Sequence, residues 1–75
     1  MNILGRTSLD DAQYREALRA AVRYLRTGGK LKNKHIRMLA GLNYDQAIKF
    51  FNRAVAERTL IRVGCGGGTH YVLPR

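Results

Sequence analysis

The apolar residues of this sequence change their spacing once, and that change limits the possible folds more than any other feature. At about 100° per residue, one set falls inside a helical arc of about 140°, and its members are Tyr14, Ala17, Leu18, Ala21, Val22 and Leu25. After Thr59 the pattern alternates instead, in the segments Leu60-Ile61-Arg62-Val63 and Thr69-His70-Tyr71-Val72-Leu73, which a glycine-rich run at 64–68 separates. The sequence therefore predicts an α+β domain that begins with helices and ends with a β-hairpin.

Turn and capping residues predict where the first helix begins and ends. We expect it to begin near Ser8, an N-cap residue with Asp11 three positions later. The pair Gly28-Gly29 supplies the stop, because glycine readily adopts the backbone conformation that ends a helix. The segment Lys30-Leu31-Lys32 then alternates polar and apolar residues, which predicts a very short strand.

Two further helices are predicted before the hairpin. Asn33 is placed to cap a helix that Gly41 ends. Asn43, with Gln46 three residues later, predicts a capping box for a third helix that runs to about Thr59. The predicted core residues are Ile36, Leu39 and Ala40 on the second helix, and Ala47, Phe51, Ala54 and Val55 on the third.

The chain of 75 residues is long enough for one core only, since small domains bury about 60% of their unfolded surface. We assign residues 1–7 to a flexible leader and residues 8–75 to a single domain. Lys and Arg number 14 against 5 Asp and Glu, so the formal net charge is +9. An excess of this size indicates a polyanionic partner, with nucleic acid first and an anionic membrane surface second.

Other classes of protein are disfavoured by what the sequence lacks. It has no apolar run of membrane-spanning length and no signal-peptide core, so we expect a cytoplasmic protein with no membrane partner. Cys65 has no second cysteine to pair with, and Cys65, His35 and His70 have no metal-ligand spacing. We therefore expect no enzyme activity, no catalytic residue, no metal and no cofactor.

The predicted order of helix, short strand, helix, tight turn, helix and hairpin resembles that of a winged helix-turn-helix domain. Within that fold the sequence is similar to the C-terminal winged-helix domain of Schlafen AlbA-like and helicase-like transcriptional regulators. The matching residues are Asn33, Ile36-Arg37, Gly41-Leu42, Asp45-Gln46-Ala47, Leu60, Gly64, Gly66, Gly68-Thr69, Tyr71 and Val72-Leu73. Arg58 stands where that family commonly has a glycine, and Cys65 and Gly67 stand where it commonly has basic residues.

The resemblance implies a DNA-binding function, because the third helix of such domains enters the major groove. The candidate contacts on this helix are Asn43, Tyr44, Gln46, Lys49, Asn52 and Arg53. The second helix contributes Lys32, Lys34 and Arg37 as phosphate contacts, and the wing contributes Arg62 and His70. The expected function is that of a small transcriptional regulator or accessory protein that binds double-stranded DNA. We expect such a protein to be associated with the nucleoid.

The first helix offers an alternative working surface. Arg15, Arg19, Arg23 and Arg26 lie within an arc of about 80° beside its apolar stripe. This ridge is suited to a protein partner, to RNA or to self-association. It is equally consistent with solvated side chains whose stems cover apolar surface.

Overall fold

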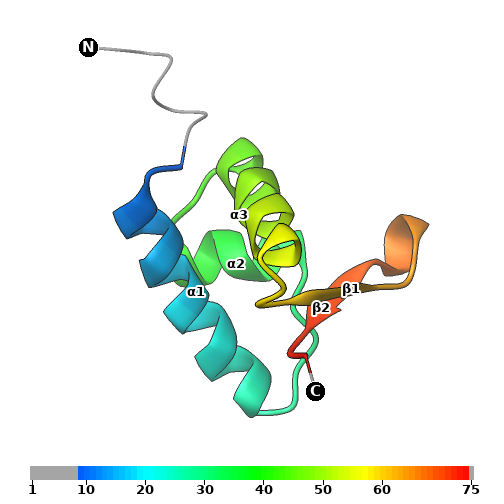
Figure 1. Ribbon diagram of the computed structural model, residues 1–75. Helices are drawn as coiled ribbons and strands as arrows, with labels where there is room; N and C mark the ends of the chain where they lie inside the picture. The colour runs from blue at the N-terminus through cyan, green and yellow to red at the C-terminus, as the bar shows by residue number, and fades with distance from the viewer. Residues whose placement is uncertain (1–8, 75) are drawn as a thin grey trace.

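The computed structural model describes residues 9–74 and contains three helices followed by a β-hairpin (Figure 1). The predicted leader at residues 1–7 lies outside the described residues. Helix α1 spans Asp11–Arg26, and its N-cap is Asp10 rather than the predicted Ser8, which also lies outside them. The Asp10 carboxylate accepts from the Gln13 backbone N–H at 2.8 Å, while the Gln13 side chain accepts from the Asp10 N–H at 3.1 Å. This reciprocal pair fixes the start of the helix because it satisfies two amide groups that the helix leaves without partners.

Helix α2 spans Asn33–Ala40, so Asn33 is its first residue and Lys32, not Asn33, is its N-cap. The predicted N-cap was wrong by one position. The side chain that forms a hydrogen bond at the start of this helix belongs to His35, not to Asn33. His35 Nδ1 accepts a hydrogen bond from the Lys32 backbone N–H at 3.0 Å. Gly41 ends the helix in the left-handed conformation, at φ 66°, as expected.

Helix α3 spans Tyr44–Ala56 and begins with the predicted capping box. Asn43 Oδ1 accepts from the Gln46 N–H at 2.8 Å, and Gln46 Oε1 accepts from the Asn43 N–H at 3.1 Å. The helix ends at Ala56, earlier than the predicted Thr59, and Arg58 then has a φ of 63°. A side chain in this left-handed region costs about 1–2 kcal/mol, and glycine avoids that cost.

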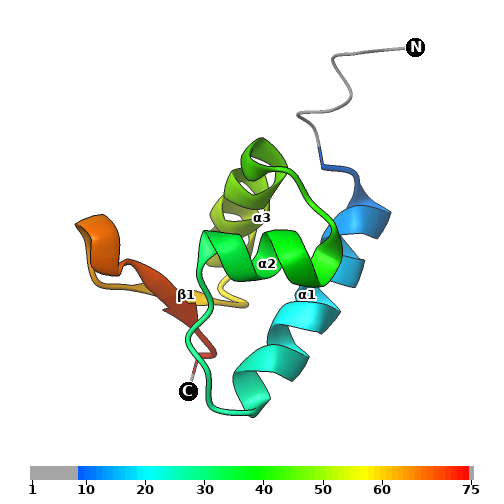
Figure 2. The ribbon, with the colours of Figure 1, turned by 180° about the vertical axis from the view of Figure 1, so that it is seen from behind.

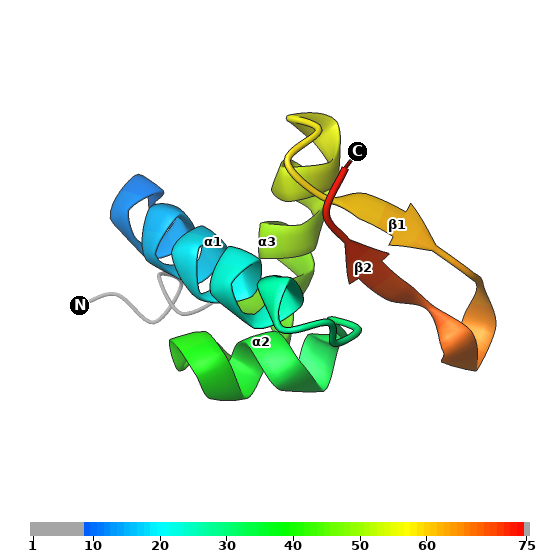
Figure 3. The ribbon, with the colours of Figure 1, turned by 90° about the horizontal axis from the view of Figure 1, so that it is seen from below.

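The hairpin pairs β1 (Ile61–Val63) with β2 (His70–Val72) in antiparallel register, and Gly66–Gly68 form a 3₁₀ turn at the tip. The predicted strand at 30–32 is a single bridge between Leu31 and Tyr71, with hydrogen bonds of 2.8 and 3.3 Å. The hairpin extends away from the helices as a wing (Figure 3). The fold is therefore the predicted small α+β arrangement of a winged helix-turn-helix.

The core lies between the three helices and the base of the wing. Phe50, Leu31, Ile36 and Leu60 are its largest fully buried side chains. Two predicted core residues lie at its edge instead, since Val55 is 36% exposed and Leu39 is 44% exposed. Within residues 9–74, no helix is long and apolar enough to cross a membrane.

Candidate nucleic-acid interface

A groove lies where the start of α2, one side of α3 and the wing come together. These three parts are separate in the sequence but adjacent in space when the domain is viewed from behind (Figure 2). The groove is lined by Lys32, Asn33 and Lys34 from α2 and its cap, by Tyr44, Ile48, Phe51 and Asn52 from α3, and by Gly66, Thr69 and Tyr71 from the wing. Cationic, amide and apolar side chains thus share one concave surface.

Aromatic stacking fixes the width of this groove. The rings of Phe51 and Tyr71 are nearly parallel, with an interplanar angle of 5° and centroids 3.8 Å apart. Because Tyr71 also bridges to the backbone of Leu31, the wing is joined both to α3 and to the segment before α2. The two rings bury their apolar faces against each other, which is the main contribution of such a contact because aromatic pairs favour offset or edge-to-face geometry over this nearly face-to-face one. The groove is therefore a preformed part of the fold.

Positive charge gathers at the α2 side of the groove. Lys32 and Lys34 line it directly, and the Arg37 guanidinium lies 5.6 Å from the ring centroid of Tyr44, which is 58% exposed. Asn33 Oδ1 is a buried oxygen without a hydrogen-bond partner in the described part of the chain, and this residue also lines the groove. Buried polar atoms are rarely left unpaired. This surface is suited to an anionic ligand that carries hydrogen-bond donors.

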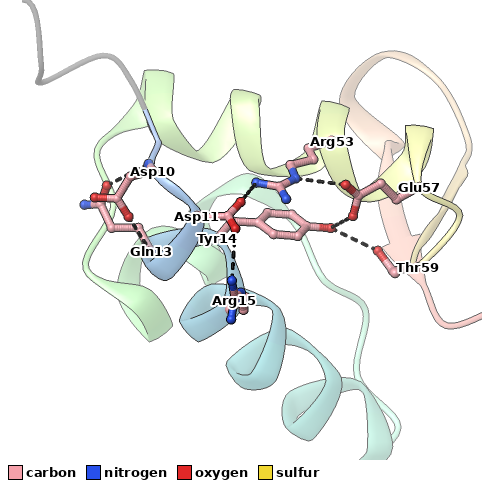
Figure 4. A network of polar contacts seen from close by, with 8 residues as sticks. All are labelled: Asp10, Asp11, Gln13, Tyr14, Arg15, Arg53, Glu57 and Thr59. Carbon is pink, nitrogen blue, oxygen red and sulfur yellow. Dashed lines mark hydrogen bonds and ion pairs between the residues drawn. The ribbon is translucent and has the colours of Figure 1, made fainter.

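Arg53 points toward Asp11 and Tyr14 of α1 and toward Glu57 (Figure 4), and it does not line the groove. Its guanidinium forms ion pairs with Asp11 at 2.8 Å and with Glu57 at 3.0 Å, and it lies 4.0 Å from the ring centroid of Tyr14. Hydrogen bonds from Arg15 and Arg53 lower the pKa of Asp11. Arg53 thus joins α3 to α1, and we remove it from the candidate interface.

Asn43 and Gln46 have a local role as well. Their side-chain oxygens form the capping box of α3, so those oxygens are already engaged by backbone amides. Neither residue lines the groove. Lys49 and Asn52 are both exposed, and Asn52 lies on the groove side.

The predicted wing contacts lie outside the groove. Arg62 shares a shallow hollow with Val55, Arg58 and Ile61 at the base of the wing. His70 Nδ1 lies 3.0 Å from the Gly68 carbonyl oxygen, a contact that holds its ring against the tip of the wing. The wing residues that do line the groove are Gly66, Thr69 and Tyr71.

This fold is shared by a solved structure. The DIP2311 protein from Corynebacterium diphtheriae superposes with a TM-score of 0.73 and 25% sequence identity over 92% of this chain. The match covers 12% of the DIP2311 chain, so this domain corresponds to a small part of that protein. No family model matches the sequence, and no curated protein matches it.

Sequence reasoning missed Ile48 and Thr69 as groove residues. Ile48 is 39% exposed and lines the groove. The sequence did contain an indication that Ile48 lines the groove. It lies four residues after Tyr44 and four before Asn52, and residues at this spacing share one helix face. Among the described residues, no cluster of His, Cys, Asp and Glu is able to hold a metal ion.

A second surface hollow lies on α1 and includes part of the arginine ridge. It is lined by Leu18, Arg19, Val22, Arg23 and Arg26. Arg15 is set apart from the other ridge arginines because it pairs with Asp11 at 3.0 Å. The ridge therefore has two parts. Arg15 is paired with an acidic residue, whereas Arg19, Arg23 and Arg26 lie beside the half-buried Leu18 and Val22.

His35 makes the start of α2 sensitive to pH. Its Nδ1 accepts from the Lys32 N–H, which requires the neutral imidazole, and its ring stacks on Tyr24 with centroids 5.3 Å apart. Burial, with the charges of Lys34 and Lys32, lowers the pKa of His35 below 6.5. The unfolded chain therefore binds this proton more readily than the folded domain does. Stability from His35 is complete above pH 6.5 and is lost as the pH falls toward the folded-state pKa.

We expect the urea midpoint of unfolding to be lower at pH 5 than at pH 7.5, with His35 responsible for part of the difference. The matched control is His35→Gln, because glutamine occupies the same position in the capping boxes of α1 and α3 and does not titrate. This variant should keep its midpoint more nearly constant across the same range. Equal pH dependence in the two proteins would show that His35 does not contribute.

Proposed function

We propose that this domain binds double-stranded DNA, with the exposed side of α3 in the major groove and the wing beside the flanking backbone. The observation that carries the proposal is the groove itself, in which lysines, amides and the glycine tip of the wing converge from three elements. Phosphate contacts position a protein on DNA, and contacts to base edges specify the sequence. The groove supplies side chains of both kinds.

The charge of the chain supports the same ligand. Lys32 and Lys34 line this surface and Lys49 is exposed on α3, and none of the three forms a salt bridge in the described part of the chain. Most acidic residues are elsewhere, since Asp11 and Glu57 pair with Arg53 and Asp10 caps α1. A module with these properties is suited to a transcriptional regulator or accessory protein, acting in the cytoplasm on the nucleoid.

The hollow on α1 favours a second candidate function, which is contact with a protein or with RNA. Its half-buried Leu18 and Val22 are bordered by Arg19, Arg23 and Arg26. Interfaces often combine an apolar centre with arginine. In this alternative, α1 is the working surface and the groove plays no part in binding.

Two double variants that remove equal charge from the two surfaces distinguish the candidates. Binding of each variant to a labelled 20-base-pair duplex is measured by fluorescence anisotropy at several salt concentrations. For Lys32→Ala with Lys34→Ala, the slope of log affinity against log salt should become shallower by about 2, because each lost phosphate contact removes about 1. Arg19→Ala with Arg23→Ala should leave the slope unchanged. The reverse result would contradict the proposed interface and support α1.

A further inference from the structure

Three residues along one side of α3 line the groove, and this stripe consists of an apolar side chain between two side chains that carry polar groups. Tyr44, Ile48 and Asn52 follow each other at intervals of four residues, and all three line the groove. Ile48 is 39% exposed, whereas the core residues Ala47 and Phe51 on the same helix are 0% and 3% exposed. Val55 of the same helix is similarly exposed, at 36%, but only Ile48 of the two lines the groove, where a bound ligand would cover it.

The major groove of DNA offers a partner of matching chemistry. Thymine is the base that carries a methyl group at this edge, and apolar side chains contact it. Adenine presents an acceptor and a donor there, which a single asparagine can bond together. Four residues of helix rise about 6 Å. Since base pairs are about 3.4 Å apart, Ile48 and Asn52 are spaced to reach base pairs about two steps apart.

The other polar residues of α3 are not placed to bond guanine from this side of the helix. The guanidinium of Arg53 is engaged by Asp11 and Glu57, and the Gln46 oxygen is engaged in the capping box. Lys49 is exposed beside the stripe but does not line the groove. The residues of α3 that line the groove therefore favour A·T over G·C base pairs.

We propose that Ile48 and Asn52 give the domain a preference for A·T base pairs, in which Ile48 covers a thymine methyl group and Asn52 bonds an adenine about two base pairs away. This inference rests on the proposed function, because it assigns base contacts to the same groove. It identifies two specificity-determining residues and a sequence class for the ligand.

Replacing thymine by deoxyuridine tests the methyl contact, because it removes the methyl group and keeps base pairing. Fluorescence anisotropy measures the affinity of the domain for three 20-base-pair duplexes. They are an A·T-rich duplex of non-repeating sequence, its deoxyuridine counterpart and a G·C-rich duplex. The wild-type domain should bind the thymine duplex about fourfold more tightly than the deoxyuridine duplex, as expected for one buried methyl group. Ile48→Ala should remove this difference, with its affinity for the deoxyuridine duplex unchanged.

Two further variants complete the test. Asn52→Ala should reduce the preference for the A·T-rich over the G·C-rich duplex about tenfold, within the range for loss of a bidentate base contact. Val55→Ala is the matched control, since Val55 is an apolar residue of the same helix, 36% exposed, that does not line the groove. It should retain the full discrimination against deoxyuridine. Thermal unfolding of each variant checks that all of them are folded.

The outcomes separate this inference from the function on which it rests. Salt-dependent duplex binding with equal affinity for the thymine and deoxyuridine duplexes would overturn the methyl contact and leave the DNA-binding proposal intact. Discrimination that survives in Ile48→Ala would assign it to a residue other than Ile48 and would also overturn the inference. Absence of salt-dependent binding to every duplex would overturn both proposals together.

Discussion

Phe51→Ala is expected to leave the domain largely unfolded at 37 °C. Phe51 is 3% exposed, its ring stacks on Tyr71 with centroids 3.8 Å apart, and it packs against Phe50 at an angle of 63° with centroids 5.2 Å apart. Truncation of a buried phenylalanine costs about 3–5 kcal/mol through lost burial and a residual cavity. The free energy of unfolding of a domain this small is about 5 kcal/mol. Urea unfolding followed by circular dichroism measures the loss.

The same variant should also lose DNA binding, because the unfolded chain has no groove. Val55→Ala on the same helix is the control for the stability measurement, and because Val55 is only partly buried, its free energy of unfolding should fall by no more than about 1 kcal/mol. A Phe51→Ala protein whose urea midpoint stays close to that of the wild type would show that the stack on Tyr71 does not hold the wing to α3.

Raising the salt concentration from 50 to 200 mM should weaken duplex binding by the wild-type domain about 150-fold, a loss that follows from four phosphate contacts at a slope of about −0.9 each. The expected contacts are Lys32, Lys34, Arg37 and Lys49, which surround the groove or lie beside it. Anisotropy with a labelled duplex measures the loss. The buffer should contain a reductant, because Cys65 is exposed and free to form disulfides between copies. Affinity that does not change with salt would contradict the DNA-binding proposal.

Local sequence patterns predicted the elements of the fold, and their errors have a common physical origin. The capping box of Asn43 and Gln46 was identified correctly because it needs only residues three apart. The predicted starts of α1 and α2 were wrong because more than one residue near each start is able to act as the N-cap. The side chains of Gln13 and His35 accept hydrogen bonds from the backbone N–H groups of the actual N-caps, Asp10 and Lys32. Periodicity defined the buried arc of each helix. It did not show which edge of that arc a neighbouring element covers, so Val55 and Leu39 were predicted to be buried.

The candidate site was harder to predict because it depends on contacts between distant segments. Lys32, Lys34, Tyr44 and Asn52 were selected by residue type, and the structure brings them together around one groove. Arg53 was selected for the same reason, but its partner Asp11 belongs to another helix and is not evident from spacing. Ile48 was overlooked because an apolar residue near a core arc is ordinarily assigned to the core.

The left-handed backbone of Arg58 has a consequence for how long the folded domain persists. The strain of this conformation, about 1–2 kcal/mol, is present in the native state and is relieved when the end of α3 comes apart. Where it is relieved before the transition state for unfolding, it raises the unfolding rate about fivefold or more. In that case, the residue that joins α3 to the wing shortens the lifetime of the folded domain.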